Sequence, residues 1–171
     1  MRRLLTITVF LIAGAQLVSA GDFEAGAAQS VITPELSPQH PVYLAGFGHN
    51  RIATGVHEQL YARYLTLRIA KQKLVLCSVD LIGLFYDDVL TVRREFEQTT
   101  PSAAFLIVAA THTHGGPDTL GLYGPRLLES GIDAKYLQWV SSASSAAGSS
   151  LAYHPLNEEE AARLAAFERS E

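Results

Sequence analysis

The chain of 171 residues contains a single cysteine, so no disulfide can form within it. Cys77 lies in an apolar run at residues 74–79, and we expect a buried structural residue there rather than a nucleophile. Internal repeats are also lacking, and no segment after the first twenty residues is apolar for long enough to span a bilayer. With 48% hydrophobic and 18% charged residues, the composition predicts one globular domain with its own core.

The N-terminal segment has the three parts of a secretory signal peptide. Two arginines stand near its start, residues 4–15 are apolar, and residues 18–20 are small, as at a cleavage site. A retained membrane anchor is the alternative, although the apolar stretch is short for a membrane span. The pattern therefore predicts a signal peptide at residues 1–20, a mature chain that begins near Gly21, and a secreted or periplasmic protein.

An excess of positive charge is absent as well. The whole chain has 13 Lys and Arg against 17 Asp and Glu, a formal net charge of −4. Cleavage after Ala20 would leave 11 positive residues against 17 negative ones, a net charge of −6. This balance argues against nucleic acid or an anionic membrane as a partner. A lipid substrate taken up through apolar contacts remains compatible with it.

Hydrophobic periodicity predicts an α/β fold. Strands are expected at residues 23–32, 60–69 and 73–81, where the last two form a hairpin whose second strand is central. Apolar residues recur at helical spacing in residues 86–98, and a further strand is expected at residues 105–110. Because strand, helix and strand follow one another, we expect a right-handed crossover. The predicted fold class is thus α/β, a mixed β-sheet with flanking helices.

The C-terminal part carries weaker signals. Asp133 is placed to cap a short helix that ends near Val140. Residues 141–150 contain only Ser, Ala and Gly, which predicts a flexible linker, and a short helix is expected near the C-terminus. The predicted organisation is therefore a signal peptide at 1–20, an α/β domain at 21–140, and a linker with a short helix at 141–171.

The most informative motif is Ala110-Thr111-His112-Thr113-His114-Gly115-Gly116-Pro117-Asp118, directly after a predicted strand. Side chains at i and i+2 of an extended segment point the same way, so His112 and His114 would face one cleft at the strand end. Neutral imidazole is a good zinc ligand. The glycines and the proline permit a sharp turn, which Asp118 would cap. The motif predicts a metal-site position, and a structural histidine is the alternative.

Five short stretches carry a family resemblance when they are taken in order. They are residues 25–34, 44–48, 55–63, 78–84 and 110–118. In this order they resemble the N-terminal part of the neutral/alkaline, non-lysosomal ceramidases, from Phe23 to about Val140. The family pattern often has serine where Gly115 stands, a change that leaves both imidazoles in place.

The resemblance implies a zinc-dependent amidase that hydrolyses the N-acyl bond of ceramide-like lipids. It implies that His112 is a zinc ligand and that His114 lies beside the metal, where it contacts substrate or water. His57 and Asp80 match family positions near the site and are candidate catalytic residues. From the residues alone, His57 could instead form a hydrogen bond within a turn. Asp80 could orient a histidine or cap a loop.

Family enzymes are several times longer, and their remaining zinc ligands, a histidine, a glutamate and a tyrosine, come from later sequence. The resemblance therefore implies a fragment of a larger catalytic domain, as a truncated gene or a frameshift near Val140 would produce. A catalytic zinc usually keeps three protein ligands. Two interpretations stay open: an incomplete ceramidase-like enzyme with peripheral membrane contact, or a non-catalytic fragment or lipid-binding remnant.

Overall fold

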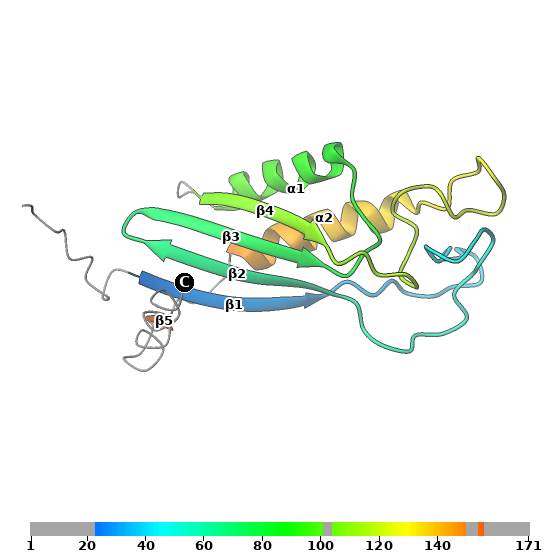
Figure 1. Ribbon diagram of the computed structural model, residues 1–171, viewed down its shortest axis with the longest axis horizontal. Helices are drawn as coiled ribbons and strands as arrows, with labels where there is room; N and C mark the ends of the chain where they lie inside the picture. Colours follow the sequence, from blue (N-terminus) through cyan, green and yellow to red (C-terminus); the bar gives the residue numbers. More distant parts are fainter. Residues whose placement is uncertain (1–22, 101–103, 150–153, 156–171) are drawn as a thin grey trace, which may run out of the picture.

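The computed structural model describes residues 23–100, 104–149 and 154–155. The predicted signal peptide and the predicted last helix lie outside these residues. The described chain forms one mixed sheet in the order β4-β3-β2-β1-β5 (Figure 1). Its strands are β1 (Phe23–Val31), β2 (Tyr61–Ile69), β3 (Gln72–Val79), β4 (Ala104–Ala110) and the two-residue β5 (His154–Pro155).

The strand pairing confirms the predicted hairpin and its central strand. β1 with β2, β2 with β3, and β1 with β5 pair antiparallel, whereas β3 and β4 pair parallel. The helix α1 (Tyr86–Thr99) provides the connection between β3 and β4 that a parallel pair requires. It begins where expected, and the Asp88 carboxylate accepts a hydrogen bond from the Phe85 N–H at its start.

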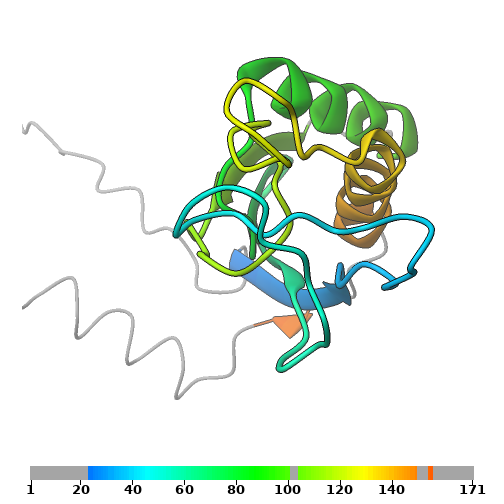
Figure 2. The same cartoon turned by 90° about the vertical axis from the view of Figure 1, so that its right-hand side faces the viewer.

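The core lies between the sheet and a layer of two helices. Figures 1 and 2 show α1 and α2 (Ala134–Ser149) side by side on one face of the sheet. Alternate β3 residues point into this core, and Cys77 is buried there as expected. The opposite face of the sheet carries exposed apolar side chains, among them Leu65 and Phe105. No helix within the described ranges is long and apolar enough to cross a membrane.

The helix α2 is longer than predicted. Asp133 caps it as expected, since its carboxylate accepts the N–H groups of Lys135 and Tyr136. However, the helix continues to Ser149, through most of the stretch predicted to be a linker. Alanine is the best helix former, and small side chains let a helix approach its neighbours closely. Ser141 is buried and Ala143 packs against the core, so the start of this stretch is part of a packed helix rather than a flexible segment.

The carboxyl ends of β3 and β4 lead into adjoining loops. The Thr111 N–H donates to the Val79 carbonyl at 2.9 Å, and the Thr113 N–H donates to the Leu81 carbonyl at 3.1 Å. These bonds extend the pairing beyond the strands, so the histidine motif lies along the segment that follows β3. A third loop joins it, because the Ala45 N–H donates to the Gly116 carbonyl and the Gly115 N–H to the Ala45 carbonyl. Figure 2 looks onto this end of the molecule.

Candidate functional site

His112 and His114 lie next to each other at the end of β4. Their ring centroids are 5.0 Å apart and the ring planes are inclined at 62°. Both residues are exposed rather than enclosed. The structure therefore brings together the two imidazoles whose spacing in the sequence indicated a shared site.

The His112 ring is fixed in one tautomer. Its Nδ1 lies 2.8 Å from the Ile82 carbonyl oxygen, and a carbonyl can only accept, so Nδ1 carries the proton. In the neutral ring, Nε2 then presents a lone pair, which is the form that binds a metal ion. His112 also has a φ of +61°, a conformation that is uncommon for a residue with a side chain. The backbone hydrogen bonds on either side of it hold this strained conformation in place.

The His114 ring packs against a loop that holds glycine at a close approach. A Cβ atom on Gly46 would lie 2.7 Å from both Cγ and Nδ1 of His114. The Phe47 ring contacts His114 edge-on at 5.2 Å between centroids. Arg51 supports this arrangement, because its guanidinium lies 5.4 Å from the Phe47 ring centroid and Nη1 donates to the Gly46 carbonyl at 2.9 Å.

Phe47 and Arg51 are site residues that the sequence analysis did not identify. The available signal was the Gly46-Phe47-Gly48 triplet, because two glycines so close together permit unusual backbone conformations. All three residues have positive φ, at +78°, +58° and +104° respectively.

Asp118 anchors the turn that follows the histidine motif. It is 2% exposed, and its carboxylate accepts four backbone N–H groups, those of Leu120, Leu122, Tyr123 and Gly131. A buried carboxylate is costly unless it is hydrogen-bonded, and four donors meet this requirement. The predicted capping role of Asp118 is therefore confirmed.

A groove of about 640 Å³ runs beside His114. One wall belongs to the histidine motif, and the others come from loop residues between Thr33 and Leu60. Apolar residues of the groove are Pro34, Leu36, Val42, Leu44, Ile52, Val56 and Leu60. His57 also lines it, but the side chain is 97% exposed and lies 3.8 Å from the Glu58 carboxylate. Its catalytic role therefore stays a prediction.

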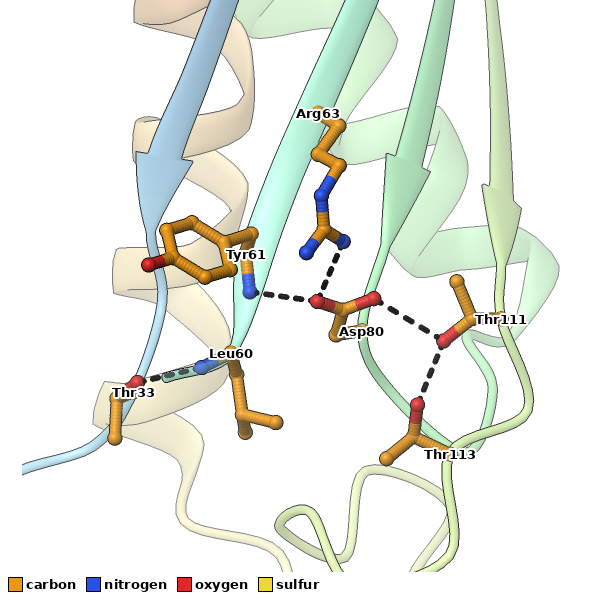
Figure 3. A network of polar contacts seen from close by, with 7 residues as sticks. All are labelled: Thr33, Leu60, Tyr61, Arg63, Asp80, Thr111 and Thr113. Carbon is orange, nitrogen blue, oxygen red and sulfur yellow. Dashed lines mark hydrogen bonds and ion pairs between the residues drawn. The ribbon is translucent and has the colours of Figure 1, made fainter. Parts of the chain in front are cut away.

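Asp80 directly follows β3, and its hydrogen bonds join it to a polar network rather than to an imidazole (Figure 3). Its Oδ2 accepts the Tyr61 N–H at 2.9 Å and the Arg63 Nη1 at 2.7 Å. Its Oδ1 lies 3.4 Å from the Thr111 hydroxyl, which in turn lies 2.7 Å from the Thr113 hydroxyl. The contacts of Asp80 thus lead to the residues that flank His112, and its catalytic role stays a prediction.

The two imidazoles offer nitrogen ligands of the kind that zinc prefers. A catalytic zinc usually takes three protein ligands, however. Within the described ranges, no group of three or more His, Cys, Asp and Glu residues could hold a metal ion. The described residues therefore fit part of a zinc site and do not complete one.

Solved ceramidase structures share this fold. No family model matches the chain, and no curated protein matches it. The crystal structure of neutral ceramidase from Pseudomonas aeruginosa is 20% identical in sequence, with a TM-score of 0.65. A ceramidase complexed with C2 is also 20% identical, with a TM-score of 0.63. Each match covers 78% of this chain and 22% of the other. The chain thus has the fold of one part of neutral ceramidase and spans 22% of the length of the solved structures it matches.

Proposed function

We propose that this chain supplies the His112–His114 corner of a zinc-dependent amidohydrolase site that cleaves the N-acyl amide of ceramide-type sphingolipids. The observation that carries the proposal is the hydrogen bond from His112 Nδ1 to the Ile82 carbonyl, which leaves Nε2 with a lone pair for a metal ion. The ring of His114 lies beside it, with 5.0 Å between the two ring centroids. The shared fold with two ceramidases supports it. The resemblance of the five sequence stretches points to the same family.

The two histidines have different roles in this proposal. His112 holds the metal through Nε2, because its other nitrogen is already committed to a carbonyl. His114 faces the groove and contacts substrate or water. A bound zinc would polarise the scissile carbonyl and lower the pKa of a bound water. By the resemblance, the other ligands of that zinc lie in later sequence.

The groove supports a lipid as the substrate. Aliphatic side chains line it next to His114, which suits the hydrocarbon chain of an amphiphile. Phe47 and Val56, beside the groove, are 77% and 48% exposed, and exposed apolar residues of this kind favour peripheral contact with a membrane surface. A secreted or periplasmic location, which the N-terminal pattern predicts, fits such a substrate.

A non-catalytic, lipid-binding role is the second candidate. One observation favours it: the described residues hold at most two of the three ligands that a catalytic zinc needs. In that case the groove would bind a lipid and no amide would be cleaved by this chain.

Zinc content and hydrolysis together separate the two candidates. The purified protein is dialysed, its zinc is measured by mass spectrometry, and hydrolysis of a fluorogenic N-acylsphingosine is followed with and without a chelator. An enzyme should keep about one equivalent of zinc and lose activity with the chelator. His112→Ala should abolish zinc retention and hydrolysis. His40→Ala, which changes an exposed histidine outside the groove, should leave zinc retention and hydrolysis unchanged. Complete loss of zinc on dialysis, with lipid binding intact, would show that this chain does not hold the metal by itself, and would favour the non-catalytic role for this chain.

A further inference from the structure

A chain of hydrogen bonds runs from the end of the sheet to the wall of the groove. Asp80 is its fixed end, because Arg63 and the Tyr61 N–H both hold one carboxylate oxygen, Oδ2. The other oxygen, Oδ1, accepts the Thr111 hydroxyl at 3.4 Å (Figure 3). The Thr111 and Thr113 hydroxyls are 2.7 Å apart, and Thr113 lines the groove together with His114.

The direction of every bond in this chain follows from counting protons. A carboxylate paired with arginine has no proton to give, so Thr111 donates to Asp80. A hydroxyl has a single proton, and Thr111 has then used it. Either hydroxyl could donate across the 2.7 Å contact between the two threonines; with the Thr111 proton directed at Asp80, Thr113 is the donor and Thr111 the acceptor.

We infer that Thr113 is a specificity-determining residue that presents only a hydrogen-bond acceptor to the groove. Its one proton is directed at Thr111, so its two lone pairs can only receive a donor from the ligand. The groove beside His114 therefore selects a ligand whose polar group carries an N–H or an O–H. The same ligand with that hydrogen replaced by a methyl group leaves the Thr113 oxygen without a donor.

Which group of the ligand donates the hydrogen bond depends on the proposed function, whereas the assignment of Thr113 as the acceptor does not. If the substrate is a ceramide-type lipid, the donor is its amide N–H or one of its hydroxyls. Asp80 is then a positioning residue, which acts on the ligand through Thr111 and Thr113 rather than by contact. In this positioning role, Asp80 needs no direct bond to either imidazole.

The test compares ligands that differ only in the donor. The purified protein is titrated with 1-octanol and with its methyl ether, and with a short-chain N-acyl amino alcohol and its N-methyl counterpart. The His114 ring signals in NMR spectra report binding. We expect the donor-bearing member of each pair to bind about two- to tenfold more tightly, as one hydrogen bond allows. Circular dichroism confirms that each of the variants described next is folded.

Three variants separate hydrogen bonding from steric effects. Thr113→Ser keeps the hydroxyl and should keep the preference. Thr113→Val has a similar shape without the hydroxyl and should lose it. Thr111→Val removes the acceptor for the Thr113 proton, so Thr113 can then donate, and the ether should bind more tightly than it does to the wild-type protein.

Two results would overturn the inference: equal binding of both members of each pair to the wild-type protein, or the same preference in Thr113→Val, which would make it steric. Failure of the proposed function looks different. In that case the octanol pair shows the Thr113-dependent preference, but the N-acyl amino alcohol is neither bound nor hydrolysed. Amide hydrolysis without any donor preference would retain the function and refute the inference.

Discussion

Substitution of Gly46 by alanine should displace His114 from its present position. The added Cβ would lie 2.7 Å from Cγ and Nδ1 of the imidazole, well inside the contact distance of about 3.5–4.0 Å between carbon atoms. The ring would have to withdraw by roughly 1 Å to reach ordinary contact. The His114 contact with Phe47, now 5.2 Å between centroids, would change with it.

Two separate effects contribute to the result. Gly46 has a φ of +78°, and a left-handed conformation costs a residue with a side chain about 1–2 kcal/mol. The collision with His114 adds a displacement of the ring, and a misplacement of about 1 Å near a reacting centre can lower activity on the order of 100-fold. We therefore expect Gly46→Ala to lower both the free energy of unfolding and any His114-dependent binding or activity.

Gly48→Ala is the matched control. Gly48 has a φ of +104°, so alanine is strained there too, but a Cβ atom would meet nothing within 4 Å. Thermal unfolding and the His114 ring signals in NMR spectra are measured for both variants. Both should be destabilised by the strained backbone, Gly46→Ala at least as much as Gly48→Ala, and only Gly46→Ala should shift the His114 signals. Equal His114 signals in the two variants would refute the reasoning that the Gly46 contact positions this ring.

Further predictions concern buried polar groups. Asp118→Ala leaves four backbone N–H groups without their acceptor, and it should destabilise the protein by about 3 kcal/mol or more in chemical denaturation; a loss below about 1 kcal/mol would show that the carboxylate does not anchor the turn. Tyr136→Phe removes the hydroxyl that donates to the Ile32 carbonyl, and it should cost about 1 kcal/mol at neutral pH. Burial raises the pKa of Tyr136, so the stability that its neutral phenol contributes is present below about pH 10 and declines above it. Unfolding curves at rising pH should therefore show a smaller alkaline loss for Tyr136→Phe than for the wild-type protein, and equal losses would contradict this assignment.

Local physical rules explain why most of the fold could be predicted. Period-two alternation located β1, β2 and β3 within two residues of their observed ends. The helix α1 followed from apolar spacing and its acidic first turn. The Ser/Ala stretch at 141–149 was predicted wrongly, because composition alone cannot distinguish a solvated linker from a helix whose small residues pack closely.

The candidate site depended both on a local sequence pattern and on contacts between distant segments. The sequence correctly placed His112 and His114 together at a strand end, but the extended backbone assumed for the i, i+2 spacing was wrong, because His112 has a φ of +61°. The contacts of Asp80 with Thr111, and of Phe47 with His114, join segments that lie 31 or more positions apart in the chain. No local pattern encodes such contacts, because they arise only when separate loops pack against one another.

The sequence by itself determined β1 to β4, the helix α1 and the position of the histidine pair at a strand end, because each depends on side chains that are close together in the chain. Only the tertiary structure decided the His112 tautomer, the four donors around Asp118 and the contact that links Asp80 to Thr111. Each of these depends on which backbone or side-chain group from a distant segment comes within hydrogen-bonding distance.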